Sequence, residues 1–159
     1  MAATFSSTLT IKSKATGANT NELATLRAEG PHELSKPLTA GTGSGNIDFA
    51  YSKTGTLAAG VPLDIDLDDS AVTEDLFGTL GAFASVKKLI VENTGSTNGM
   101  TVSGDFLGIS TEAIDIGLGA LVIYYGPTGR TVTATTADVI SLTSASGTTY
   151  KVTIEGVKT

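Results

Sequence analysis

The only histidine of the chain, His32, is the first residue to consider for catalysis, because a Ser-His-Asp triad needs an imidazole to accept the serine proton. His32 lies in the segment GPHEL, and no G-x-S-x-G motif occurs anywhere in the sequence. Zinc sites usually draw on several histidine or cysteine ligands, and the chain contains no cysteine. We therefore interpret His32 as a solvated or interface loop residue, and we expect neither an enzyme nor a zinc site.

The densest group of carboxylates lies between residues 64 and 75. It consists of Asp64, Asp66, Asp68, Asp69, Glu74 and Asp75. An EF-hand loop starting at the first of these would need glycine at its sixth position and glutamate at its twelfth, where the chain has Asp69 and Asp75. The first two aspartates alternate with Leu63, Ile65 and Leu67, which predicts a strand with a charged, solvated side that protects a sheet edge from wrong pairing. A calcium site at this cluster stays open as the alternative.

A glycine-rich segment, GTGSG at residues 41–45, resembles a phosphate-binding loop only superficially. A Walker loop ends in Gly-Lys-Ser/Thr, and here Asn46 follows the last glycine. A dinucleotide loop opens a helix, whereas Ile47 to Phe49 has the character of a strand start. We interpret the segment as a flexible connector and predict no cofactor. A glycoside hydrolase is disfavoured as well, because no carboxylate pair stands out and tryptophan is absent.

Length and charge restrict the remaining classes. The 159 residues suit one domain. Lys and Arg number 10 and Asp and Glu number 16, so a formal charge of -6 disfavours binding to nucleic acid and to anionic membranes. No apolar run approaches the roughly 20 residues of a membrane-spanning helix, and the N-terminus lacks the features of a secretory signal. We expect synthesis in a cytoplasm, with neither nucleic acid nor membrane as a partner.

Apolar residues recur mostly with a period of two, which predicts strands. The alternating segments are 5–11, 61–67 and 150–154, and the apolar-rich segments 86–91 and 121–125 are predicted to be central strands. Turns are expected at Asn98-Gly99 as a tight hairpin, at 126–129 and at Ser146-Gly147. Only 21–26 and 73–77 favour short helical turns. The prediction is an all-β protein, an antiparallel β-sandwich or small barrel with an extended N-terminal arm and long loops.

Residues 1–60 are poor in core residues and are predicted to form the arm and loop region, whereas 61–159 form the β-sandwich body. The expected interior residues of this body are apolar members of the strands. They are Leu63, Ile65, Leu67, Ile90, Ile123, Val152 and Ile154.

The stretch from 61 to 104 resembles a family of small tailed-phage proteins that are encoded near the capsid gene and described as virion structural proteins. Its pattern is an Asp-Leu strand, an acidic-apolar-Phe-Gly segment, and a Val-Lys strand ending in Asn. The matching residues are Asp66, Leu67, Asp75, Phe77, Gly78, Val86, Lys87 and Asn93. The final strand of the pattern matches 150–156, and 129–132 also matches. The chain departs from the pattern at 113–119, where it lacks a Pro-Gly-Gly turn. The resemblance covers roughly the last hundred residues.

The resemblance implies a virion component with no catalytic residue, such as a capsid cement or decoration protein assembled in the cytoplasm of a host bacterium. Its partners would be the major capsid protein or other virion proteins, and the chain would be a homo-oligomer. The alternative is a receptor- or carbohydrate-binding β-sandwich module of a virion tail or fibre. A cement protein approaches the copy number of the capsid protein, whereas a receptor binder is rare.

Contacts with neighbours are expected from two parts of the chain. The arm residues are Phe5, Leu9, Ile11, Lys12 and Lys14, and the acidic residues are Asp64, Asp66, Asp68 and Asp69. Their opposite charges suit a head-to-tail array, in which the apolar arm residues carry most of the docking by adding a strand to a sheet edge of a neighbour. An equal alternative is that 1–14 forms the first strand of its own sandwich.

Overall fold

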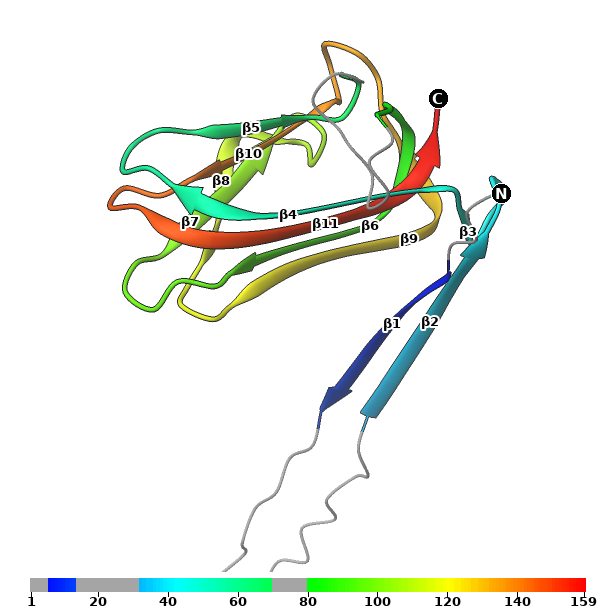
Figure 1. Ribbon diagram of the computed structural model, residues 1–159, viewed down its shortest axis with the longest axis horizontal. Coiled ribbons are helices and arrows are strands. Elements are labelled where there is room, and N and C mark those ends of the chain that lie inside the picture. Colours follow the sequence, from blue (N-terminus) through cyan, green and yellow to red (C-terminus); the bar gives the residue numbers. More distant parts are fainter. Residues whose placement is uncertain (1–5, 14–31, 70–79) are drawn as a thin grey trace, which may run out of the picture.

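The computed structural model describes residues 6–13, 32–69 and 80–159, and all regular elements within these residues are β-strands (Figure 1). The eleven strands are β1 (Ser6–Ser13), β2 (His32–Ala40), β3 (Asn46–Ile47), β4 (Phe49–Leu57), β5 (Leu63–Asp66), β6 (Phe83–Asn93), β7 (Met100–Gly104), β8 (Ile109–Ile116), β9 (Leu121–Thr131), β10 (Val139–Thr143) and β11 (Thr148–Lys158). The helical turns expected at 21–26 and 73–77 lie outside the described residues.

Eight of these strands form two four-stranded antiparallel sheets, in the orders β4-β11-β6-β9 and β5-β10-β7-β8, which pack face to face. The pairing is nested, because β4 pairs with β11, β5 with β10, β6 with β9, and β7 with β8. The strands β4 to β11 are thus paired as in one long hairpin folded over on itself, which is the jelly-roll arrangement. The predicted all-β antiparallel sandwich is confirmed.

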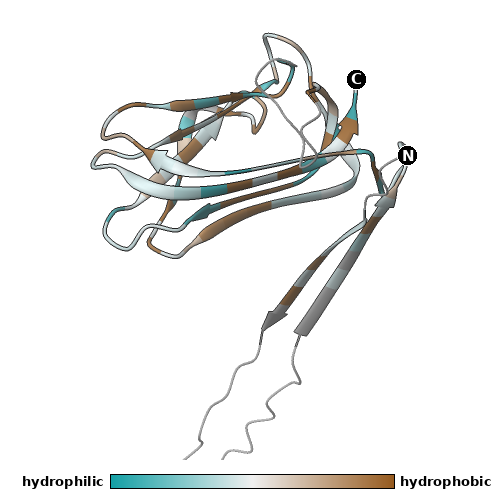
Figure 2. Ribbon diagram, in the orientation of Figure 1, coloured by the Kyte–Doolittle hydropathy of each residue, from teal (hydrophilic) through white to brown (hydrophobic). Residues whose placement is uncertain are grey.

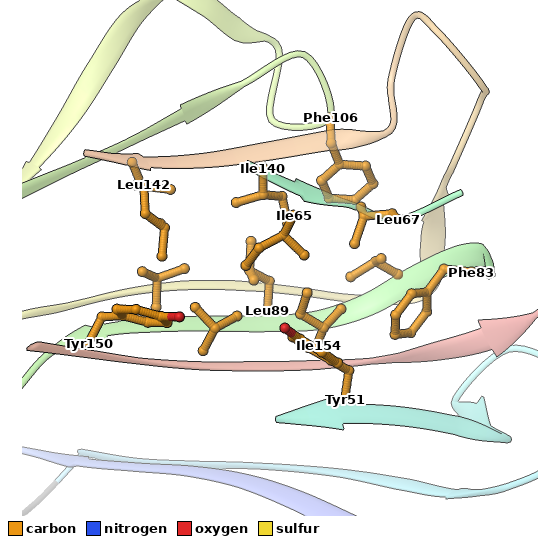
Figure 3. Close-up of a cluster of buried hydrophobic side chains, with 14 of the residues drawn as sticks. Tyr51, Ile65, Leu67, Phe83, Leu89, Phe106, Ile140, Leu142, Tyr150 and Ile154 are labelled. Atoms are coloured by element: carbon orange, nitrogen blue, oxygen red, sulfur yellow. The ribbon is translucent and has the colours of Figure 1, made fainter. Parts of the chain in front are cut away.

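The core lies between the two sheets, and period-two alternation fills it from both sides (Figure 3). Ile65 and Leu67 point down from one sheet, and Val152 and Ile154 point up from the other, all nearly inaccessible to solvent. Leu63 is only partly buried, packed against this core from the edge strand β5.

Two residues expected inside lie on the outside. Ile90 alternates with the buried Leu89 and Val91, and it stands opposite Ile123 across the β6–β9 pairing. Both isoleucines therefore project from the outer face of their sheet, where they are half-buried. The expectation that 121–125 forms a central strand is wrong for a related reason: β9 is the last strand of its sheet, whereas β6 is central as expected.

The sandwich begins earlier in the chain than predicted, and two of the predicted turns have a different structure. β4 pairs along its length with β11, so the sandwich includes residues 49–57, which were predicted to belong to the N-terminal arm and loop region. Asn98-Gly99 forms no tight hairpin, because it links β6 and β7, which belong to different sheets. The side-chain amide of Asn98 instead donates to the carbonyl oxygen of Gly147, 2.7 Å away, and so ties two loops together. Residues 126–129 interrupt β9 as an irregularity and do not end it.

Two tyrosine rings in the core give the fold a dependence on alkaline pH. Burial, reinforced by the nearby Tyr150 phenol, raises the pKa of Tyr51 from 10.0 to about 12. The native state therefore holds this proton more tightly than the unfolded chain, so its stabilising contribution is complete below pH 10 and declines as the pH rises towards 12.

We expect the free energy of unfolding, measured by urea titration, to fall by up to about 3 kcal/mol over this range through Tyr51 alone. Tyr51→Phe should flatten the decline, whereas Tyr125→Phe, at a half-buried position on the outer face, should leave it unchanged. An equally steep decline in Tyr51→Phe would contradict the assignment.

Candidate assembly surface

The N-terminal strands form a separate sheet that projects from the sandwich (Figure 1). β1 pairs antiparallel with β2, from Ser6 opposite Thr39 to Ser13 opposite His32, and the two-residue β3 adds parallel to β2. We call β1 and β2 together the arm hairpin. Residues 6–13 are thus neither a strand of either sandwich sheet nor a lone extended segment.

One face of the arm hairpin is mainly apolar, and we call it the apolar face. Ser7, Leu9 and Ile11 alternate along β1 on this face, and Leu38 stands opposite Ser7 and Lys36 opposite Leu9 in the pairing. Near the body the face is covered, since Leu9 is 8% and Leu38 is 1% exposed, but Ile11 further along is 40% exposed. Figure 2 shows brown, hydrophobic bands along β1. The apolar face therefore extends beyond the surface that its own body covers.

A buried ion pair anchors the hairpin to the body. The Lys88 ammonium lies 2.5 Å from Glu155 Oε1, and the two side chains are only 6% and 10% exposed. Ser7 Oγ donates to the same carboxylate oxygen at 2.9 Å and accepts a hydrogen bond from Lys88 Nζ. Both charged residues lie on the outer face of sheet β4-β11-β6-β9, which we call the arm-side sheet. Because burying charges is expensive unless they are paired, this cluster favours one position of the hairpin over others.

A second anchor holds the turn at the base of the arm. Lys87, 1% exposed, donates from Nζ to the carbonyl oxygens of Gly43 and Asn46, the latter at 2.6 Å. Burial lowers the pKa of Lys87, and the charge of Asp48 acts in the opposite direction. The amide of Gly45, with φ of 74°, donates to Pro127 at 2.8 Å. The glycine-rich segment predicted as a flexible connector is thus a turn tied to the body.

The acidic strand lies on the far side of the sandwich from the arm (Figure 1). Asp64 and Asp66 project from the outer face of β5, an edge strand, as the alternation predicts. Asp66 Oδ1 accepts the amides of Asp68 and Asp69 at 3.0 and 3.2 Å, which shapes the turn after the strand. Within the described residues no group of three potential ligands could hold a metal ion; Glu74 and Asp75 are outside them.

The described charges are divided unequally between the two layers. Sheet β5-β10-β7-β8 with the adjoining residues 58–69, 100–116 and 132–143 contains eight acids and no base, namely Asp64, Asp66, Asp68, Asp69, Asp105, Glu112, Asp115 and Asp138. We call this layer the acidic sheet. The strands of the arm-side sheet contain six bases and two acids, namely Lys53, Lys87, Lys88, Arg130, Lys151 and Lys158 against Glu92 and Glu155. The arm-side sheet is therefore less repulsive than the acidic sheet towards another acidic molecule.

Apolar side chains are exposed on the outer face of the arm-side sheet next to the ion pair. Ile90 follows Lys88 on the same face of β6 and pairs with Ile123 of β9, and Leu121 lies one row further, opposite Glu92. Ile90 and Ile123 are half-buried and Leu121 is 49% exposed. We call these three residues the apolar stripe. β9 has a free edge beside it, because β9 is the last strand of its sheet.

A hollow of about 560 Å³ opens at the end of the sandwich where the β6–β7, β8–β9 and β10–β11 loops meet. Met100 and Ile116 form its apolar part, and Thr101, Thr143 and the exposed Asp115 add polar groups. No aromatic ring lines this hollow, so a stacking platform for a sugar ring is missing there.

The predicted site residues fall into distinct places. Leu9 and Ile11 lie on the apolar face of the arm hairpin, as the docking hypothesis requires, whereas Phe5 and Lys14 are outside the described residues. Lys12 stands opposite Glu33 in the register of the hairpin. Asp64, Asp66, Asp68 and Asp69 lie together at β5, remote from the arm of the same chain.

The anchoring residues Ser7, Lys87, Lys88 and Glu155 were not predicted. A signal was present in the sequence, since two adjacent lysines interrupt the apolar run at 86–91.

No protein-family model, curated protein or solved structure matches the chain. In the described part of the chain, no helix is long and apolar enough to span a membrane.

Proposed function

We propose that this chain is a non-enzymatic structural component of a tailed-phage particle, a cement or decoration protein that stabilises the capsid shell through its arm hairpin and sheet edges. The observation that carries the proposal is the arm hairpin itself, anchored by the Lys88–Glu155 pair and exposing Ile11 beyond the body. A pre-positioned apolar arm loses little freedom on docking, which suits many modest contacts repeated by symmetry.

Two further features support this assignment. Jelly rolls recur among viral capsid domains, although a fold does not by itself define a function. The acidic sheet would be repelled by packaged DNA and suits the outer side of a shell. The binding partners are the major capsid protein or another virion protein, together with further copies of this chain.

The second candidate is a receptor- or carbohydrate-binding module of a tail or fibre. The hollow at the loop end, with Asp115 and two threonines, is the observation that favours it. Mass-spectrometric stoichiometry of purified particles separates the two functions. A copy number near that of the capsid protein supports the cement protein, and a few copies per particle would establish the alternative instead.

Removing residues 1–40 should abolish binding to the shell without unfolding the body. The hydrophobic cluster of the sandwich contains no residue before Phe49, so the core stays intact in the shortened chain. We expect circular dichroism to show a folded β-protein, whereas particles assembled with this variant lose the protein and become less resistant to heat.

The matched control is Val61→Ser, which changes a 56% exposed apolar residue at the opposite end of the body and should remain on the particle. Retention of the shortened chain at full copy number would refute the role of the arm.

A further inference from the structure

We infer that the outer face of the arm-side sheet is the docking site for a second copy of this chain, with the end of each arm hairpin lying across the apolar stripe of the other copy. This inference rests on the assembly role proposed above, and it names the receiving surface and its occupant.

The first reason is the continuity between the stripe and the site of the arm's own anchor. Ser7 contacts Lys88 and Glu155, which form one cross-strand pair, or row, on the outer face of the arm-side sheet. The next row on the same face contains Ile90 and Ile123, and the one after it contains Leu121. The arm hairpin of the same chain thus already binds this face at the Lys88–Glu155 pair. The neighbouring cross-strand pairs present partly exposed apolar side chains that the hairpin of a second copy would cover.

The second reason is that the arm offers the matching surface. Its apolar face passes from the covered Leu9 to Ile11, which is 40% exposed, as the hairpin runs away from the body. Ile11 is therefore an apolar residue of the arm hairpin that its own body covers only in part. The apolar stripe and Ile11 are thus apolar groups that remain at least partly accessible to solvent.

The third reason is electrostatic and selects the face. Two copies that met through their acidic sheets would bring eight carboxylates of each copy together with no base in either layer. Meeting through the arm-side sheets keeps these layers on opposite outer sides of the pair. The buried Lys87 and Lys88 are already bound within their own copy, so they add little repulsion.

The resulting contact is isologous, since each copy gives a hairpin end and receives one on the same face. Such a two-fold pair closes on itself, unlike the head-to-tail array of arms and acidic strands that the sequence suggested. The acidic β5 strands then lie on the outer surface of the pair and make no contact within it.

The absence of cysteine from the chain makes a direct test possible. Ile11→Cys and Ile123→Cys are prepared as separate full-length proteins, reduced, mixed and oxidised under mild conditions. We expect the mixed disulfide to form at least about tenfold faster than between Ile11→Cys and Val61→Cys, because docking raises the local thiol concentration. Val61 is 56% exposed whereas Ile123 is half-buried, so accessibility alone would favour the control.

Equal rates for the two mixtures, or sedimentation of the unmodified chain as a monomer at high concentration, would overturn the inference. Ile123→Lys gives a second readout, since it should shift the sedimenting species from dimer to monomer while the circular-dichroism spectrum is kept. A monomeric chain that still binds empty capsids through residues 1–40 would remove this inference and leave the proposed function standing. Absence from purified particles, with the dimer present, would remove the proposed function alone.

Discussion

Ile65→Asp should lower the free energy of unfolding by about 4 kcal/mol or more, the largest effect of any single change considered for this chain. Ile65 is 3% exposed and lies between the two sheets, where Figure 3 shows it among Ile140, Leu67 and Leu89. An aspartate there would either hold an unpaired charge in an apolar interior or take up a proton, and it would also leave part of the isoleucine volume empty.

Urea titration followed by circular dichroism measures this loss. Val61→Asp is the matched control, because it makes the same exchange of a β-branched apolar residue for aspartate at a 56% exposed position. The control should change stability by less than about 0.5 kcal/mol. An Ile65→Asp protein with the midpoint of the wild type would mean that the two sheets do not pack as described.

Gly104→Ala should cost about 3–5 kcal/mol, because two independent restrictions meet at this residue. Gly104 has φ of 126°, a conformation that residues with a side chain rarely adopt. A Cβ atom built on it would also lie 2.2 Å from the carbonyl oxygen of Val139, which is backbone of the neighbouring strand and cannot rotate away. Relief would require β7 and β10 to separate at this point.

Gly117→Ala provides the comparison, since a Cβ there meets no atom within 4 Å and the residue has no left-handed φ. The free energy of unfolding of the Gly117→Ala protein should stay within about 1 kcal/mol of the wild type. Alanine would stabilise it only by making the unfolded chain less flexible. Thermal unfolding of the two variants side by side measures the difference. Similar melting temperatures for both would contradict the described pairing of β7 with β10.

The strands that the sequence predicted well are those with one wet and one apolar side. β5 and β11 follow strict alternation, and their inward residues Ile65, Val152 and Ile154 are buried as expected. Alternation identifies the two faces of a strand, but it does not say which face meets the core when both carry apolar residues. For this reason Ile90 and Ile123 were assigned to the interior, although their neighbours Leu89 and Val91 occupy it.

β4 was missed because its composition resembles a linker. Its sequence FAYSKTGTL contains a glycine and a polar run, which usually indicate a loop. The glycine has a structural reason: Gly55 stands opposite Tyr150, and a Cβ atom there would lie 2.8 Å from the tyrosine hydroxyl oxygen. The ring of Tyr150 takes the place that a side chain at residue 55 would need, and this cross-strand relation is invisible before the pairing is known.

The anchors of the candidate site were not identified from the sequence for a different reason. A register shift in the β6–β9 pairing between Val86 and Lys88 accompanies the two adjacent lysines. Lys87 then reaches the turn at Gly43, and Lys88 reaches Ser7 and Glu155. Bulges of this kind depend on the partner strand, so a period-two pattern cannot locate them. The arm residues Leu9 and Ile11, in contrast, belong to a regular alternation and were identified from it.

The position of β11 has a consequence for how the chain reaches its folded state. β11, the last strand along the chain, lies between β4 and β6, the first and third strands of the sandwich. Those two strands cannot join into one sheet until residues 148–158 have left the ribosome, and such non-local pairing is intrinsically slow. Until then the unpaired sides of β4 and β6 can template pairing with another chain, which makes this interval a hazard for aggregation. A translation product that stops before Thr148 would keep both edges open, and this makes it a natural substrate for chaperones and proteases.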